Sequence, residues 1–378
     1  LIILFIVIGR SFVKLINYFK KLWKKNVVFF IPSIEGGGVE KNFFLLLRFL
    51  IKKFDKIYVI SVHKKIFRNN KKIIQISPSS KLYFNRGRLI KTLICLWLLI
   101  KNFIFKNTVV LSFQSNVPVI ILSKILGFKV LVRLNTSLKK YIDNFLKKFF
   151  FKTVYSFSDK IVVNSREFKN ELRAININSI LIYNLIEPEK SKKNLKFFKK
   201  YRGLKILNIG RLTSQKDQIT LIKSLNLLKL KKINFRCCII GKGNLMKYLQ
   251  KNISKYRLTR NVLLLGYKKE AENYIHNCNL FVLTSKYEGL PNVLIEAQKF
   301  SIPIISSNCP TGPKEILLNG KLGDLFKVGD YKDLARKVIL FNLKKTNLQK
   351  KSLLAKKYLF RFDAFINSSQ YEKLINKI

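Results

Sequence analysis

Short, mainly apolar runs recur along the chain and are separated by longer segments that mix apolar and polar positions. Runs of this length, bounded by polar or glycine-containing segments, are typical of strands that are buried on both faces. The segments between them, such as residues 88–104, lack breakers and predict helices. The runs lie at residues 27–31, 57–62, 109–113, 130–134, 160–164, 204–209, 235–240, 262–265, 279–283 and 302–306.

The alternation of strands and helices predicts an α/β fold with doubly wound parallel sheets. At 378 residues the chain is long enough for two domains, and a Lys-dense segment at residues 190–202 marks the expected boundary. We expect an N-terminal domain at residues 27–186, a linker at 187–203, a second domain at 204–345 and C-terminal helices at 346–378.

Residues 1–26 stand apart because an apolar stretch, residues 1–8, is soon followed by Arg10, Lys14 and Lys20. A membrane-spanning helix needs about 20 apolar residues. Three interpretations stay open: a signal-like segment, an interfacial helix, or upstream residues wrongly included. We expect no spanning helix elsewhere.

The segment 284–297 reads Thr-Ser-Lys-Tyr-Glu-Gly-Leu-Pro-Asn-Val-Leu-Ile-Glu-Ala and joins a predicted strand to a predicted helix. Pro291 suits the first helical position. Glu288 would then lie in the loop at the carboxyl end of the strand, and Glu296 on the second helical turn. Backbone N–H groups at a helix N-terminus bind anions, and carboxylates accept hydrogen bonds from hydroxyls. An anion with many hydroxyls describes a sugar nucleotide, although two such carboxylates can also be solvated surface charges.

Other predicted strands also end in residues suited to a phosphate. Gly37 and Gly38 lie in a glycine loop between a strand and a helix, where backbone can approach a phosphate. Arg211 follows the strand at 204–209, and we place Lys216 in the first turn of the next helix. A lysine there opposes the helix dipole unless an anion is bound. Asn135 follows a further strand at the same kind of edge.

Taken together, these segments resemble the retaining glycosyltransferases of family 4, which have the GT-B fold. Their Glu-x7-Glu motif matches Glu288 to Glu296, and the resemblance runs from about Val27 to the C-terminus. It implies two Rossmann-like domains that face each other across a cleft, with a last helix, residues 358–378, that crosses back to the first domain. The segment 307–316 looks like that of bacterial enzymes that build lipid-linked glycans, O-antigen or capsule.

The resemblance also implies a role for each motif residue. Arg211 and Lys216 would hold the donor diphosphate, Glu288 the hydroxyls of the transferred sugar, and Glu296 the ribose. Retention of configuration follows from the family alone, and front-face transfer is the default because no double-displacement nucleophile is identifiable. We expect further substrate contacts from Gly37, Gly38, Asn135, Gly241, Gly243, Gly289, Leu290, Asn292, Thr311 and Gly312. Asn135 stands where relatives often have a His.

The net charge of +54 is extreme, and Lys, Asn, Ile and Phe are all abundant. Bias from an AT-rich coding sequence explains this first, and attraction to an anionic surface second. Arg-rich clusters with interleaved aromatics are not apparent, so we expect no nucleic-acid partner. The five cysteines show no C-x-x-C spacing, and neither His falls in a metal-binding motif. We therefore expect buried thiols, no metal and no cofactor.

The sequence thus predicts a retaining glycosyltransferase of cell-surface glycan synthesis. It would move a UDP-linked hexose or N-acetylhexosamine to a lipid-linked or polysaccharide acceptor. We expect it in the cytoplasm, peripheral on the anionic inner face of the cell membrane. Two alternatives stay open: a basic nucleic-acid-binding protein, which rests on charge alone, and a non-catalytic glycan-binding relative, against which the four motif side chains argue.

Overall fold

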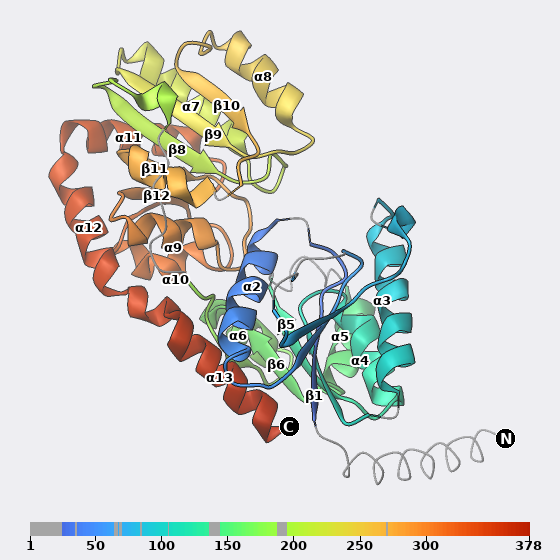
Figure 1. The fold of residues 1–378 in the computed structure, drawn as a ribbon. Coiled ribbons are helices and arrows are strands. Elements are labelled where there is room, and N and C mark those ends of the chain that lie inside the picture. The colour runs from blue at the N-terminus through green and yellow to red at the C-terminus, as the bar shows by residue number, and fades with distance from the viewer. Residues whose placement is uncertain are drawn as a thin grey trace. The chain divides into compact units, whose positions relative to one another are not determined.

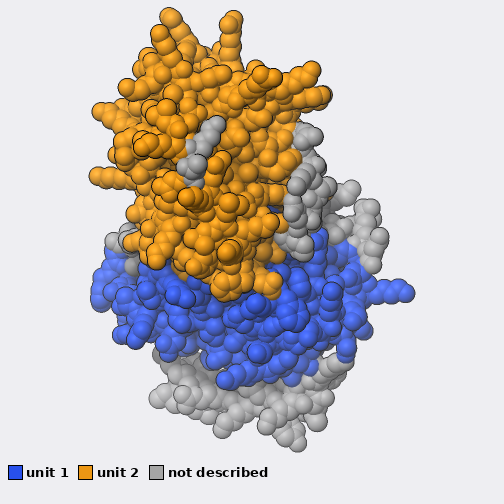
Figure 2. All heavy atoms as spheres, turned by 90° about the vertical axis from the view of Figure 1, so that its left-hand side faces the viewer, with its two compact units in different colours: residues 1–185, 364–378 blue, residues 186–363 orange. Residues whose placement is uncertain are grey.

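The computed structural model describes residues 25–34, 36–63, 67, 70–83, 85–104, 106–135, 144–186, 195–269 and 271–378. The chain forms two compact units, residues 1–185 with 364–378 and residues 186–363, which are coloured blue and orange in Figure 2. Residues 1–24 of the expected N-terminal segment and residues 187–194 of the expected linker lie outside the described residues.

The first unit contains a parallel sheet in the order β3-β2-β1-β4-β5-β6-β7. Strand β1 pairs with β2 on one side and β4 on the other, so that Val28 lies between Tyr58 and Val110. The strands are β1 (Asn26–Phe30), β2 (Ile57–Ile60), β3 (Ile73–Ile76), β4 (Thr108–Ser112), β5 (Lys129–Leu134), β6 (Lys160–Val163) and β7 (Ile180–Leu181).

Helices cover both faces of this sheet (Figure 1). Alternate residues of β1 enter two separate cores: Val28 and Phe30 pack with α3, α4, α5 and α6, whereas Val27 and Phe29 pack with α2 and α13. Because both faces are buried, the strand is apolar from Val27 to its end, as in other parallel sheets. The helices are α2 (Gly38–Leu50), α3 (Arg88–Phe103), α4 (Asn116–Ile125), α5 (Phe145–Ser156), α6 (Arg166–Arg173) and α13 (Ala364–Lys377).

The second unit contains a parallel sheet in the order β10-β9-β8-β11-β12-β13. Its strands are β8 (Leu204–Ile209), β9 (Phe235–Ile240), β10 (Val262–Gly266), β11 (Leu280–Leu283), β12 (Ile304–Ser307) and β13 (Asp324–Phe326). Its helices are α7 (Gln218–Leu230), α8 (Met246–Lys255), α9 (Asn292–Lys299), α10 (Pro313–Ile316), α11 (Tyr331–Leu343) and α12 (Lys345–Lys357).

The expected fold class is confirmed, because each sheet is parallel and reverses its strand order beside its first strand. Every apolar run named above contains a strand, and β3, β7 and β13 are additional. These three strands are only partly buried and have two to four residues each, so the apolar signal that they leave in the sequence is weak.

Two helix starts differ from the prediction. Helix α7 begins at Gln218, so Lys216 lies in the turn before the helix and not in its first turn. Asp217 occupies the N-cap with a φ of 48°, and its carboxylate accepts a hydrogen bond from the Thr220 hydroxyl. Helix α9 begins at Asn292, which makes Pro291 its N-cap residue and not its first helical residue.

Candidate functional site

The candidate site lies in the second unit, where the chain leaves β8 and β11 at the carboxyl edge of the sheet. From β8 the chain continues through α7 to β9 on one side, whereas β11 pairs with β8 on the other side. Open α/β sheets bind ligands at such a reversal of strand order. Arg211 and Lys216 follow β8, and Glu288 follows β11, so the fold brings these predicted residues to one place.

An ion pair between Lys216 and Glu288 joins the two segments in this place. Lys216 Nζ lies 2.5 Å from Glu288 Oε1, with side chains that are 15% and 7% exposed. The Ser285 hydroxyl donates to the same carboxylate oxygen. Backbone contacts fix the lysine as well, because Thr284 Oγ1 donates to the Lys216 carbonyl at 2.8 Å. Sequence reasoning placed both charged residues at the site but did not predict this pair.

Arg211 is exposed, in contrast to Lys216. Its Nη2 donates to Gln215 Oε1 at 3.2 Å. Gln215 in turn donates to the Tyr287 carbonyl, and its own carbonyl accepts from the Lys286 amide at 2.8 Å. Gln215 therefore ties the loop after β8 to the loop after β11. Nothing in the sequence marks this glutamine except its place between Arg211 and Lys216.

Gly241 and Gly243 have a packing role in the loop after β9. A Cβ on Gly241 would lie 1.8 Å from the carbonyl oxygen of Gly210, and one on Gly243 would lie 2.1 Å from that of Leu212. Only glycine allows this loop to approach the β8 loop so closely. The two glycines therefore shape the site by bringing backbone together, whether or not they also touch a substrate.

Thr311 and Gly312 brace the loop that carries Glu288. The Thr311 hydroxyl donates to the Glu288 carbonyl, and the Glu288 amide donates to the Pro310 carbonyl at 3.2 Å. Gly312 has a φ of +96°, and a Cβ there would lie 2.3 Å from the Gly289 carbonyl oxygen. The segment before α10 thus presses against the chain that leads into α9.

The remaining predicted residues of this unit lie around the start of α9. Gly289 and Leu290 are buried in the loop, and Asn292 is the first residue of the helix. Glu296 lies on the second turn of α9, as predicted, and is buried. Both motif carboxylates, Glu288 and Glu296, are therefore withdrawn from bulk water. This excludes the alternative interpretation of the two residues as solvated surface charges.

Gly37, Gly38 and Asn135 belong to the first unit and form a separate group. Gly37 caps α2, and Glu40 on that helix accepts a hydrogen bond from Gln114 Nε2 at 3.2 Å. Gln114 also bonds both backbone groups of Ser33, so it joins the loops after β1 and β4 at the strand reversal of this sheet.

Asn135 is positioned by a buried arginine that sequence reasoning did not single out. Arg133 is 1% exposed, and its Nε donates to Asn135 Oδ1 at 3.1 Å. Its other nitrogens donate to the Tyr371 hydroxyl on α13 and to Asn184 Oδ1, each at 2.5 Å. The sequence signal that could have identified Arg133 is its place as a single charged residue within the apolar run of a strand.

Cysteines and metal-binding groups add little to the site. All five cysteines are buried free thiols, as expected. Burial and the nearby Glu288 carboxylate raise the pKa of Cys309 to about 12, so this thiol stays protonated at neutral pH. In the part of the chain that the structure describes, no three His, Cys, Asp or Glu side chains form a group that could hold a metal ion. The described residues also include no helix with the length and hydropathy needed to cross a bilayer.

Sequence comparisons point to the same part of the chain. Residues 189–353 match the family model described as Glycosyl transferases group 1. An uncharacterized glycosyltransferase of Methanocaldococcus jannaschii is 35% identical over 223 residues, which cover 54% of this chain and 55% of the relative. The chain thus spans about half the length of that relative.

One relative matches more of the chain at lower identity. It is the N-acetylgalactosamine-N,N'-diacetylbacillosaminyl-diphospho-undecaprenol 4-alpha-N-acetylgalactosaminyltransferase of Campylobacter jejuni. The two are 25% identical over 332 residues, which cover 79% of this chain and 85% of the relative.

Among solved structures, the fold is similar to that of HepE from Anabaena in complex with UDP and glucose. The TM-score is 0.77 at 17% identity, with 94% of this chain and 100% of the other covered. Residues 189–353 are therefore similar in sequence to the glycosyl transferases of group 1, and the chain as a whole has the GT-B fold.

Proposed function

We propose that the protein is a retaining glycosyltransferase of the family 4 type, with a nucleotide-diphosphate sugar as donor. One observation carries this proposal: Lys216 and Glu288 meet at the strand reversal of the second unit, with Arg211 beside them. This place combines cations for a diphosphate with a carboxylate for sugar hydroxyls. It lies within the segment that matches the group 1 transferases.

In this proposal the two cations stabilise the leaving group. The bond between the sugar and the diphosphate breaks with a build-up of negative charge on the phosphate oxygen, and Arg211 and Lys216 offset that charge. Such stabilisation acts most strongly where the groups are fixed beforehand and water is excluded. The hydrogen bond from Thr284 and the burial of Lys216 supply that fixation. We expect the cations to act without a metal ion.

The carboxylates have separate roles in the proposal. Glu288, held by Ser285 and Lys216, would accept hydrogen bonds from the transferred sugar. Glu296, one helical turn beyond the start of α9, would accept from the ribose. We assign the donor as a UDP-linked hexose or N-acetylhexosamine. The HepE structure holds UDP and glucose, and this similarity supports the nucleotide.

The acceptor is the second substrate of the proposed reaction. We propose a lipid-linked or polysaccharide acceptor in cell-surface glycan synthesis, bound by the first unit near Gly37, Gly38 and Asn135. The Campylobacter relative, whose name includes a diphospho-undecaprenol acceptor, supports the lipid-linked class. Such an acceptor would place the protein on the cytoplasmic face of the cell membrane, with anionic lipid as a partner.

A binding screen followed by a transfer assay tests this function. UDP, GDP, ADP and dTDP are each added to the full chain, and the melting temperature is measured. We expect one of them, UDP first, to raise it, because a ligand that binds only the folded state stabilises that state. Release of nucleoside diphosphate from the matching sugar donor then reports transfer. If none of the four binds, the proposed function is wrong.

A further inference from the structure

Helix α5 in the first unit is apolar on two opposite sides. One side carries Phe151, Val154 and Tyr155, which are buried in the core. The other side exposes four large side chains that follow the helical repeat: Phe145 (78% exposed), Leu146 (75%), Phe149 (63%) and Phe150 (54%). A surface helix typically carries polar side chains on the side opposite its core-facing side. A contiguous exposed apolar patch marks an interaction surface for a membrane, another protein or a ligand.

The neighbouring helices extend this surface. The outward side of α3 exposes Leu89, Leu93 and Trp97, one turn apart from each other, and α4 exposes Ile121 and Ile125. Helices α3, α4 and α5 pack on the same face of the sheet, into one core, so their outward sides point the same way (Figure 1). The Thr92 and Ser115 hydroxyls, 2.7 Å apart, join α3 to the start of α4. We call the outward side of these three helices the outer helix face.

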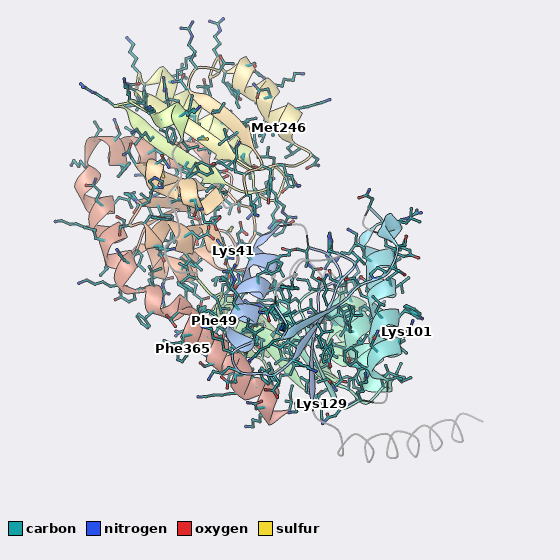
Figure 3. All side chains as sticks on the ribbon, in the orientation of Figure 1. Lys41, Phe49, Lys101, Lys129, Met246 and Phe365 are labelled. Atoms are coloured by element: carbon teal, nitrogen blue, oxygen red, sulfur yellow. The ribbon has the colours of Figure 1, made fainter. Side chains whose placement is uncertain are left out.

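Basic side chains lie among these apolar residues, and acidic ones are absent from the three helices. Lys147, Lys148 and Lys152 are exposed on α5, Lys124 on α4, and Lys101 on α3. Lys101, labelled in Figure 3, lies over the Trp97 ring at 5.0 Å. The sequence has no Asp or Glu between Asp55 and Asp143, a stretch that includes all of α3 and α4. The outer helix face therefore combines apolar side chains with lysines, on helices that contain no acidic residue.

A groove of about 1040 Å³ opens beside the same face, between α3 and the edge strand β3. Leu93, Trp97 and Lys101 belong to both the groove and the outer helix face. Ile73 and Tyr83 line its other side. Through these shared residues the groove is continuous with the outer helix face.

We propose that the outer helix face docks on an anionic lipid bilayer. The Phe, Leu and Trp side chains would enter the acyl boundary while the lysines contact acidic headgroups, which is how amphipathic helices lie in an interface. A second copy of the chain fits this face poorly, because symmetric pairing would bring its lysines together. Nucleic acid fits poorly too, since the aliphatic side chains have no partner on a phosphate backbone. The inference deepens the proposed function and rests on it only for the presence of a lipid-linked acceptor.

Vesicle co-sedimentation of the full chain tests the docking. Vesicles of phosphatidylcholine with phosphatidylglycerol are compared with phosphatidylcholine alone, and we expect binding to the anionic vesicles that weakens at high salt. Combined Phe145→Ser, Phe149→Ser and Phe150→Ser should reduce the partition coefficient at least about tenfold. Combined Lys147→Gln, Lys148→Gln and Lys152→Gln should reduce it by up to about a hundredfold.

Matched variants on other surfaces distinguish docking by the outer helix face from nonspecific hydrophobic or electrostatic adsorption to the vesicles. Leu343, Phe360 and Phe365 are also exposed apolar residues, and Lys247, Lys251 and Lys255 are exposed lysines on α8. Replacing these triplets by Ser and by Gln should leave vesicle binding within about twofold. In a Trp23→Phe background, the Trp97 emission should shift to the blue when anionic vesicles are added, because the indole leaves water.

Several outcomes would overturn the proposal. One is that the wild type does not sediment with anionic vesicles. Another is that the α5 variants bind as well as the wild type does. A third is that the control triplets lose as much binding as the α5 variants do. Binding of single-stranded RNA that the lysine changes on α5 abolish, without vesicle binding, would replace the bilayer by nucleic acid. Nucleoside-diphosphate binding is measured on the same variants. Its absence together with α5-dependent docking would refute the proposed function and leave the membrane surface standing.

Discussion

Lys216 and Glu288 form a short ion pair although 72 positions separate them in the sequence. The pair joins the turn before α7 to the loop before α9, so it fixes the two segments that carry the predicted site. In the proposed function, the donor diphosphate competes with Glu288 for this lysine. The same two side chains thus determine both the local structure and the binding of the donor.

The first prediction concerns the cations. Lys216→Ala and Arg211→Ala should each lower kcat/KM for the donor by about tenfold to a hundredfold, because each removes a charge-assisted contact of about 1.5–3 kcal/mol. Calorimetry with the nucleoside diphosphate should show a similar loss of affinity. Lys231→Ala, which changes an exposed lysine at the end of α7, serves as the control. Full activity in Lys216→Ala would exclude this lysine from the site.

The second prediction separates the two carboxylates. Glu288→Gln should mainly lower kcat, because its contact to the transferred sugar strengthens in the transition state. A Gln oxygen can still accept from Ser285 and Lys216, so the loop keeps its shape and the change reports the lost charge. Glu296→Gln should mainly raise KM for the donor, since a ribose contact contributes equally to ground state and transition state.

Binding of the free nucleoside diphosphate decides between the two roles. We expect Glu288→Gln to keep that binding, because a neutral amide competes with the diphosphate for Lys216 less strongly than the carboxylate does. If Glu288→Gln abolishes it while Glu296→Gln does not, the two assignments are reversed.

The third prediction concerns metal ions. Because two cations are assigned to the leaving diphosphate, transfer should continue after dialysis against EDTA, with less than about a twofold loss of kcat. The measurement compares treated protein with protein to which Mg²⁺ or Mn²⁺ is added back. Complete loss with EDTA that either metal restores would contradict the assignment of the cations.

Glycine at position 241 gives a fourth prediction. A Cβ there would lie 1.8 Å from the Gly210 carbonyl oxygen, so Gly241→Ala should push the β8 and β9 loops apart. The expected cost is about 1–3 kcal/mol or more, seen as a lower melting temperature together with weaker binding of the nucleoside diphosphate.

Gly87→Ala is the matched control for this change. Gly87 has a φ of −58°, and a Cβ there would meet nothing within 4 Å. Its replacement should change stability by less than about 1 kcal/mol. Equal effects of the two substitutions would show that the close approach at Gly241 does not limit stability.

The strands of both sheets were predictable because a strand buried on two faces leaves an uninterrupted apolar run. Strand β11, whose four residues are all apolar and buried, illustrates this, whereas the edge strand β3 is only partly buried and was missed. The approximate positions of Arg211 and Glu288 followed from the same logic, since the carboxyl ends of parallel strands meet at one edge.

Contacts between distant segments could not be predicted in this way. The sequence places Lys216 inside the first turn of a helix that in fact begins two residues later, at Gln218. It does not show that Asp217 is the N-cap residue and that its side chain bonds Thr220. Nor does it show that Gly241 meets the backbone of Gly210, or that Arg133 is buried against Tyr371. These features depend on which side chains lie close together in space. Neither the periodicity of apolar residues nor the composition of the chain carries that information.

The last prediction concerns Asp217, which is buried in the turn before α7. Burial raises the pKa of its carboxyl above the usual 3.8, although Thr220, Lys286 and Lys223 act in the opposite direction. A raised pKa in the folded state means that ionisation costs more in the fold than in the unfolded chain. That cost is absent below pH 3.8, grows as the pH rises to the folded pKa, and is then constant.

Asp217→Asn should therefore stabilise the protein at neutral pH, by up to about 1 kcal/mol. The neutral amide avoids the cost of ionisation, and Asn, like Asp, tolerates the φ of 48° found here, so the turn keeps its conformation. The Asn oxygen can still accept from the Thr220 hydroxyl. Melting temperatures of wild type and variant, measured from pH 7 down to about pH 4, should differ most at pH 7 and converge in acid. A variant that is less stable at pH 7, or a difference that does not change with pH, would show that the carboxylate stabilises this turn.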